Sequence, residues 1–252
     1  MTNTGSFLST WRTPPRDLLL RDDEIHVWAA FVDQPPTFVS RMLRVLSSDE
    51  RARAERFHFP RDRHRYIIAR GFLRAILGRY LNIDPADVSI SYLPSGKPVL
   101  APEWSGDQLL FNLSHSHELA LCAVGRGRRL GIDVEYVRAE LAAERIAERF
   151  FSPGEVTTLR ALPQSCQAEA YFACWTRKEA YIKARGEGLQ IPLNQFEVVV
   201  APGQPAAVLH DEVDPQAKSR WSLQSLDLGP RYAAALTVEG QGWQLRRWLW
   251  AG

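Results

Sequence analysis

Alternating and helical hydrophobic patterns divide the chain into a succession of strands and helices. Residues 24–32 (EIHVWAAFV) are almost wholly apolar and predict an early strand. Residues 62–81 place apolar side chains at helical spacing and predict a long amphipathic helix. Shorter extended runs predict further strands at 88–93, 109–116, 119–125 and 130–137.

The second part of the chain repeats the plan of the first. Ser47 and Ser152 can each cap a helix, and a glutamate three residues later can complete a capping box. The offset that superimposes the serines also superimposes Tyr66 and Tyr171, each within a long helix. We therefore expect two α/β halves of similar plan. Strands expected at 196–201, 221–226, 232–238 and 243–250 would complete the second half as a largely antiparallel sheet.

The composition is that of a soluble globular protein, with 252 residues, of which 45% are hydrophobic and 24% charged. A formal net charge of +2 gives no whole-protein argument for binding nucleic acid. The three cysteines are unpaired in number and lack C-x-x-C spacing, which favours a reducing cytoplasm and no structural zinc. No apolar run approaches ~18 residues and no signal peptide is apparent, so we expect a cytoplasmic protein that does not enter a membrane.

Two carboxylates lie side by side in the strand GIDVEYV. Asp133 and Glu135 point to one face of this strand, and Ile132 and Val134 point to the other. Like charges at this spacing repel unless something positive lies between them. The pattern fits a solvated strand face or a shared cation, and D-x-E alone does not decide between them.

A third carboxylate interrupts an apolar helical stripe in WTRKEAYIK. Glu179 shares one helix face with Phe172, Trp175 and Ile182, which predicts that this face turns toward the core. One interpretation is a surface ion pair between Glu179 and Lys183, four residues on. The other is a buried carboxylate that needs a cation.

One magnesium ion would explain all three carboxylates together. Mg²⁺ prefers oxygen ligands and is usually held by a few carboxylates and substrate phosphates. Asp133, Glu135 and Glu179 would supply the carboxylates, while Lys178 and Lys183 could reach the same phosphates as point charges.

The segment FNLSHSHEL offers serine and histidine near a strand end. It lacks the glycines of a nucleophile elbow, so hydrolysis is poorly supported, and His115 and His117 lack a third zinc ligand at a recognisable spacing. Ser114 and His115 could donate to an anion, or could serve only as a loop corner. Most arginines of the basic segment 51–65 suit a solvated helix face, but two or three of them could converge on a phosphate.

Four ordered motifs carry a family resemblance. GKP, FNLSHS, GIDVE and WTRKEAYIK, spread over roughly residues 40–200, resemble the phosphopantetheinyl transferases of the surfactin-synthetase type. The family patterns G-[IV]-D-x-E and W-x-x-K-E-[AS]-x-x-K are both complete here. The resemblance implies an α/β (α+β) pseudo-dimer of two similar halves, each an antiparallel-rich sheet packed with a long helix. Residues 1–128 would form the coenzyme A 3′-phosphate and adenine side, and residues 129–252 the half with the metal-binding carboxylates.

The resemblance also implies roles for particular residues. Asp133, Glu135 and Glu179 would bind Mg²⁺, and Glu179 and Lys183 would act in catalysis. Arg53 matches one of the family's two basic residues on this side, whereas the other falls at Glu50, with Arg51 adjacent. The residues expected to bind coenzyme A are Arg51, Arg53, Tyr66 (adenine side), Ser95, Gly96, Lys97, Pro98, Ser114, His115, Lys178 and Lys183 (the last two facing the pyrophosphate).

The implied reaction transfers a phosphopantetheine arm. A serine hydroxyl of an acyl or peptidyl carrier protein attacks the β-phosphorus of coenzyme A and releases 3′,5′-ADP. Glu179, directly or through a metal-held water, would accept the serine proton, while Lys183 would hold that carboxylate and the leaving phosphate. The carrier would dock near the junction of the halves, around Arg145, Arg149 and Phe151. We expect a monomer.

Three other functions use some of the same residues. A non-catalytic coenzyme A or nucleotide-binding protein would keep the phosphate contacts without transfer. A metal-dependent phosphohydrolase would use the same ion but a water nucleophile. A structural α/β domain with surface ion pairs would respond neither to Mg²⁺ nor to coenzyme A.

Overall fold

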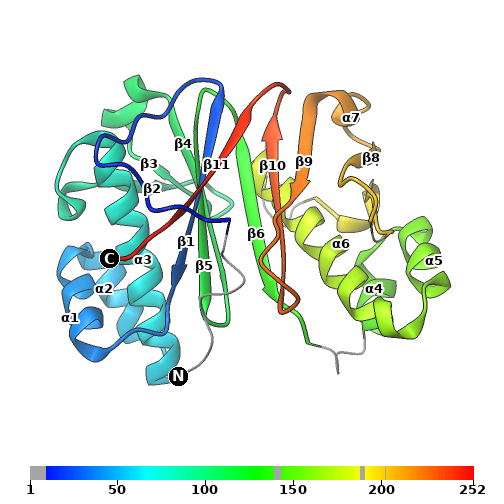
Figure 1. The fold of residues 1–252 in the computed structure, drawn as a ribbon, viewed down its shortest axis with the longest axis horizontal. Helices are drawn as coiled ribbons and strands as arrows, with labels where there is room; N and C mark the ends of the chain where they lie inside the picture. The colour runs from blue at the N-terminus through cyan, green and yellow to red at the C-terminus, as the bar shows by residue number, and fades with distance from the viewer. Residues whose placement is uncertain (1–9, 139–142, 188–190, 202) are drawn as a thin grey trace.

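Two groups of helices enclose two β-sheets that face each other (Figure 1). The computed structural model describes residues 10–138, 143–187, 191–201 and 203–252. One core cluster lies between the sheets, and two others lie between each sheet and its own helices. The order across the molecule is therefore helices, sheet, sheet, helices.

The first half runs from an early strand to a β-hairpin. Its long helix α3 packs on a four-stranded sheet of order β11-β1-β5-β4. The elements are β1 (Glu24–Phe31), α1 (Pro36–Val45), α2 (Ser48–Glu55), α3 (Pro60–Leu81), η1 (Pro85–Asp87), β2 (Ile90–Tyr92), β3 (Pro98–Leu100), η2 (Pro102–Asp107), β4 (Leu109–Ser116) and β5 (Leu119–Arg126).

The second half follows the same order. Its long helix α6 lies over a three-stranded sheet of order β6-β10-β9. The elements are β6 (Leu130–Tyr136), α4 (Ala143–Phe150), α5 (Pro153–Ala161), α6 (Gln164–Arg185), η4 (Leu193–Gln195), β7 (Phe196–Val198), β8 (Val208–Asp211), α7 (Ala217–Arg220), β9 (Trp221–Ser225) and β10 (Tyr232–Glu239), and the final strand is β11 (Gln244–Leu249).

The repeated plan expected from the two capping serines is confirmed. Helices α3 and α6 both have 22 residues, and each follows a short helix that begins with a capping box. In both boxes the glutamate is buried, and its carboxylate also forms an ion pair with basic side chains of the long helix. Glu50 is bound by Arg70 and Arg74, and Glu155 by Lys178. Each pair ties the short helix to the long one.

The last strand does not join the half in which we expected it. β11 pairs in parallel with β1, from Glu24 opposite Gln244 to Ala29 opposite Leu249. Trp248 and Trp250 pack against the core of the first half. The prediction that residues 243–250 complete the second sheet is therefore wrong. The alternating pattern encodes a strand, but its burial against α3 and β1 selects the sheet.

The two sheets meet at strands β4 and β6. Each is an edge strand of its sheet, and within the described ranges no strand pairing joins the two sheets. Since β6 pairs with β10 on one side only, its outward backbone N–H groups need other acceptors. Side chains of β4 provide them, as described below.

None of the helices in the described part of the chain is both long enough and apolar enough to span a membrane.

Candidate active site

A glycine allows α6 to approach β6 at the junction of the halves. Gly131 is the first residue of GIDVE, and a Cβ atom there would lie 2.2 Å from the carbonyl oxygen of Ala180 and 2.3 Å from the backbone nitrogen of Ala184. Such contact is possible only without a side chain. The close approach brings Glu179 and Lys183 of α6 over the carboxylates of β6.

Asp133 is the most densely bonded of the predicted carboxylates. Its Oδ1 atom accepts hydrogen bonds from Lys183 Nζ at 2.5 Å and from Ser114 Oγ at 2.8 Å. Its Oδ2 atom is buried and has no hydrogen-bond partner among the residues described. A buried carboxylate oxygen without a donor is costly, so this atom is suited to accept a cation.

The other two carboxyl groups hold their protons more tightly than usual. Burial raises the pKa of Glu135, and nearby Asp133 raises it further, although a hydrogen bond from Ser116 opposes the shift. Burial raises the pKa of Glu179 to about 7, against the opposing charge of Lys183. Asp133 and Glu135 add to that rise, so all three predicted carboxylates lie within electrostatic reach of one another.

The inward residue of WTRKEAYIK is Lys178 rather than Glu179. Lys178 has no exposed surface and lies in a buried stripe with Cys174 and Tyr181, whereas Glu179 is only half-buried. The Lys178 ammonium donates to Glu155 at 2.7 Å and to the backbone oxygen of Phe196 at 2.6 Å. Our assignment of Lys178 to the pyrophosphate is therefore wrong, because its donors point into the core.

Lys183 takes a partner that we did not expect. Its ammonium is bonded to Asp133 at 2.5 Å and to Ser114 at 3.3 Å. Its effect on Glu179 is only through charge, with no hydrogen bond between them in the described structure. The expected pair of Lys183 with Glu179 is thus replaced by a pair with Asp133.

Residues from three motifs line a cavity of about 270 Å³ beside these groups. The predicted residues that line it are Ser95, Gly96, Lys97, Pro98, Glu179 and Lys183. The Lys97 ammonium donates to the carbonyl oxygens of Leu130 and Lys183 at 3.1 and 2.5 Å, and Ser95 donates to Gly186. Burial lowers the pKa of Lys97 to about 8. The turn SGKP is thereby fixed to β6 and α6.

The remaining predicted residues lie in two places. His115 keeps an exposed surface on β4, yet burial of its ring, together with the charges of Lys183 and Arg65, lowers its pKa, and the charge of Asp133 opposes this shift. It therefore lies within electrostatic reach of Asp133 and Lys183. The Arg53 guanidinium lies 5.8 Å from the centre of the Tyr66 ring, and Arg53 also lines an open hollow of about 440 Å³.

Arg51 does not reach this hollow in the structure. Its guanidinium donates to the carbonyl oxygens of Arg44 and Leu46 at 2.9 Å each, at the end of α1. These contacts cap α1, because the carbonyls have no partner within the helix, and the expected role of Arg51 in binding coenzyme A stays a prediction.

Comparison with known proteins decides the family. One family model, described as "4'-phosphopantetheinyl transferase, N-terminal", matches residues 33–126, and another, "4'-phosphopantetheinyl transferase superfamily", matches residues 129–237. A relative from Nostoc sp., the 4′-phosphopantetheinyl transferase HetI, is 43% identical over 239 residues, which are 95% of this chain and 98% of the relative. The chain belongs to the 4′-phosphopantetheinyl transferase superfamily. The family and enzyme class expected from the motifs are thus confirmed.

Two further relatives agree with this assignment. A putative 4′-phosphopantetheinyl transferase of Synechocystis sp. is 31% identical over 202 residues, covering 80% of this chain and 79% of the relative. The 4′-phosphopantetheinyl transferase Sfp of Bacillus subtilis is 28% identical over 213 residues, covering 83% of this chain and 90% of the relative. The transferase assignment therefore applies to both halves of the chain.

Sequence reasoning missed two polar residues of the transferase site. Asn112 and Ser116 flank Ser114 at alternate positions of β4, and all three side chains accept backbone N–H groups of β6. Ser116 also donates to Glu135 at 2.7 Å. The signal was present as N-x-S-x-S in FNLSHS, because alternate residues of a strand share a face.

The three residues expected to dock the carrier do not form one exposed surface in the described structure. Phe151 is 3% exposed and belongs to the core of the second half, so it cannot contact a partner. The Arg145 side chain lies outside the described residues. Arg149 is exposed, with its guanidinium over the Phe150 ring. Phe151 is therefore excluded, Arg149 is retained as a candidate contact, and Arg145 stays a prediction.

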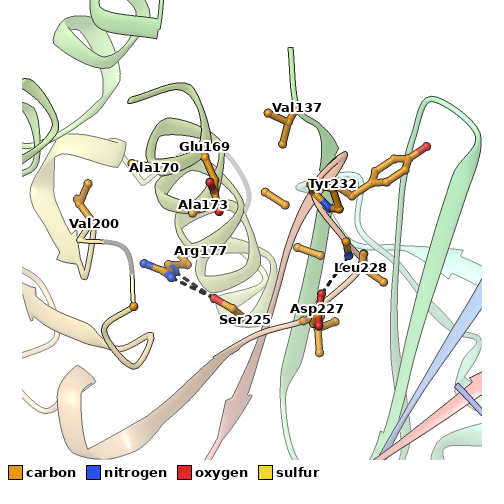
Figure 2. Close-up of a pocket in the computed structure, with 16 residues that line it drawn as sticks. Val137, Glu169, Ala170, Ala173, Arg177, Val200, Ser225, Asp227, Leu228 and Tyr232 are labelled. Carbon is orange, nitrogen blue, oxygen red and sulfur yellow. Dashed lines mark hydrogen bonds between the residues drawn. The ribbon is translucent and has the colours of Figure 1, made fainter. Parts of the chain in front are cut away.

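A larger cavity, of about 490 Å³, lies elsewhere in the second half of the transferase. Figure 2 shows it between α6 and the β9–β10 connection, where Arg177 donates to Ser225 through Nε at 3.3 Å and Nη2 at 3.1 Å. None of the residues predicted to act in catalysis or binding lines this cavity. The candidate active site is therefore chosen by the convergence of charged groups and not by the volume of the cavity.

Proposed function

We propose that this transferase moves the phosphopantetheine arm of coenzyme A to a serine hydroxyl of an acyl or peptidyl carrier protein, with Mg²⁺ as cofactor and 3′,5′-ADP as leaving product. The observation that carries the proposal is the group at the junction of the halves. There Asp133, Glu135, Glu179 and Lys183 converge beside a cavity that also exposes Lys97.

The residues of this site fit a magnesium ion. The buried Asp133 Oδ2 lacks a donor, and the raised pKa values of Glu135 and Glu179 reflect carboxylates whose charge is incompletely balanced. Within the described ranges, no three His, Cys, Asp or Glu side chains stand as a ready metal-binding group. An incomplete set of protein ligands still suits Mg²⁺, because this ion keeps waters and takes substrate phosphate oxygens as further ligands. When bound, it would offset the charge of the pyrophosphate.

Two lysines are positioned for the phosphates of coenzyme A. Lys183 keeps 28% of its side chain exposed and lines the cavity, so one ammonium hydrogen remains for a phosphate oxygen while the others bind Asp133 and Ser114. Lys97 has a pKa of about 8 and is mostly charged at neutral pH. Arg53, beside Tyr66, is our candidate for the distal 3′-phosphate because an arginine fork matches phosphate geometry.

Glu179 is suited to accept the proton of the attacking serine. In the ligand-free protein burial raises the pKa of Glu179 to about 7, and a bound Mg²⁺ would lower it, so the carboxylate would be ionised and able to accept the proton directly or through a metal-held water. No hydrogen bond from a described residue occupies this carboxylate, so the side chain is available to an incoming hydroxyl. The attacking oxygen belongs to the carrier, and the chain therefore needs no nucleophile of its own.

Intact-mass spectrometry of an apo carrier protein tests the reaction. Incubation with this protein, coenzyme A and Mg²⁺ should add about 340 Da, the mass of one phosphopantetheine arm, and EDTA should abolish the gain. Glu179→Gln should slow transfer by about 10²–10⁴-fold, as expected for loss of a general base. Glu169→Gln is the control, since Glu169 lies exposed on the same helix.

Each alternative gives a different result in this experiment. A phosphohydrolase would release phosphopantetheine without any carrier. A binding protein would be stabilised by coenzyme A in a thermal melt but would modify none of several carriers. Full turnover of Glu179→Gln at saturating Mg²⁺ would show that Glu179 is not the base.

A cytoplasmic, monomeric protein remains part of the proposal. Cys122, Cys166 and Cys174 are all free thiols, which fits a reducing compartment. Sedimentation would test the monomer, and cell fractionation would test the location.

A further inference from the structure

Three side chains of β4 act as hydrogen-bond acceptors for the open edge of β6. Asn112 Oδ1 accepts from the backbone N–H of residue 132 at 2.8 Å, Ser114 Oγ from that of residue 134 at 3.4 Å, and Ser116 Oγ from that of residue 136 at 3.1 Å. We call these three side chains and the N–H groups that they bind the seam. Through the seam the first half fixes the strand that carries the carboxylates of the second.

The two serines of the seam each have a second contact. Ser114 donates to Asp133 at 2.8 Å, and Ser116 donates to Glu135 at 2.7 Å. Because each hydroxyl already accepts a backbone N–H through a lone pair, its single proton is free to point at the carboxylate. The Asn112 oxygen accepts from the backbone, and its amide nitrogen has no carboxylate partner among the described residues.

Glu135 depends on Ser116 more than Asp133 depends on Ser114. Asp133 is also held by the Lys183 ammonium, so it keeps a strong donor without the serine. For Glu135, the hydrogen bond that the structure describes comes from Ser116. Without it, the half-buried carboxylate is free to rotate away from Asp133, because the two like charges repel.

We propose that Ser116 is a positioning residue of this transferase, which holds Glu135 in the orientation needed to bind the divalent cation. The inference rests on the proposed function, because it assumes that Glu135 is a metal ligand. Residues that orient a metal ligand typically contribute 10–100-fold to metal affinity. Ser116 gives Glu135 a single hydrogen bond from a neutral hydroxyl, so we expect its contribution to metal affinity at the lower end of this range.

Direct metal binding to the full-length protein tests the proposal. Free and bound Mn²⁺ would be measured by electron paramagnetic resonance, with and without coenzyme A. Ser116→Ala should weaken Mn²⁺ binding about tenfold, and Ser116→Thr, which keeps the hydroxyl, should stay within about threefold of the parent. In the carrier assay, the Mg²⁺ concentration for half-maximal rate should rise by the same factor in Ser116→Ala, with kcat at saturating Mg²⁺ within about threefold of the parent.

Ser222→Ala is the matched control. Ser222 lies on β9 of the second half, where its Oγ accepts from Trp243 Nε1 at 2.6 Å and donates to the carbonyl of Gly240 at 2.8 Å, so its loss removes comparable hydrogen bonds. This hydroxyl has no carboxylate partner among the described residues, so the variant should bind Mn²⁺ as the parent does.

The possible results distinguish a failure of the positioning role of Ser116 from a failure of the proposed metal. Unchanged Mn²⁺ affinity in Ser116→Ala, or an equal loss in Ser222→Ala, would overturn the positioning role. Failure of the threonine to restore affinity in a variant that melts like the parent would also overturn it. If the parent protein binds no Mn²⁺ even with coenzyme A and transfers equally well in EDTA, the proposed metal is wrong, and the role of Ser116 fails with it.

Discussion

Replacing Glu179 with glutamine should make the ligand-free protein more stable at alkaline pH. The carboxyl is half-buried, and its pKa rises from the ordinary 4.5 to about 7 because burial disfavours the charged form. The folded state therefore binds more protons than the unfolded state between these values. Stability falls as pH rises through that window and is lowest above pH 7.

The magnitude follows from the two pKa values. The interval between 4.5 and about 7, at 1.36 kcal/mol per pH unit, corresponds to about 3 kcal/mol for a fully ionised Glu179. Solvent at the partly exposed side chain screens this cost, so we expect Glu179→Gln to stabilise the protein by about 1–2 kcal/mol at pH 8.5. At pH 5 the gain should fall to about a quarter of this value, because the carboxyl is protonated in the folded state but already partly ionised in the unfolded state, where its pKa is 4.5.

Urea unfolding in EDTA at pH 5 and pH 8.5 measures this difference. Glu169→Gln, at an exposed position of the same helix, controls for the loss of a negative charge. Adding Mg²⁺ and coenzyme A should reverse the order at pH 8.5, because the ligands stabilise the parent through the carboxylate that the variant lacks. The reasoning is refuted if Glu179→Gln changes stability equally at both pH values, or destabilises the protein at pH 8.5.

Three further predictions follow from contacts around the site. Lys178→Met leaves Glu155 buried without a cation, so the free energy of unfolding in urea should fall by about 3–5 kcal/mol, and a loss below 1 kcal/mol would contradict the buried pair. Coenzyme A affinity, measured by calorimetry, should weaken as pH rises above about 8 because Lys97 loses its proton, and Lys97→Arg should remove this dependence; identical pH profiles would exclude Lys97 as a phosphate ligand. Gly131→Ala places a Cβ atom 2.2 Å from the carbonyl oxygen of Ala180, so the thermal midpoint should fall by more than about 5 °C, as a loss of about 3 kcal/mol requires, and an unchanged midpoint would mean that α6 does not approach β6 so closely.

Local patterns in the sequence determined the elements and much of the chemistry. Strand alternation was enough to place Asp133 and Glu135 on one face, because the side-chain period of a strand is two. The capping boxes at Ser47 and Ser152 predicted the starts of two helices, because each box is closed within four residues. Both inferences rest on interactions between near neighbours in the chain.

The neighbourhood of the site depended on contacts between distant segments. Lys178 and Glu179 are adjacent on α6 and only about 100° apart around its axis, so the helical pattern could not say which one turns inward. Glu155 on α5 decided it, by offering a carboxylate inside the core. The role of Ser116 likewise appears only when β4 of one half lies against β6 of the other.

The placement of β11 shows the same difference between what local patterns predict and what long-range contacts decide. The residues from Gln244 to Leu249 read as a strand from their alternation alone, and they form one. Their pairing with β1, more than 200 positions earlier in the chain, was decided by burial of Trp248 and Trp250 on the first core. The sequence by itself therefore determined which residues form strands and helices and which side chains share a face, because those depend on local backbone geometry. Only the tertiary structure decided which faces meet, because burial and charge pairing act between segments that the chain keeps far apart.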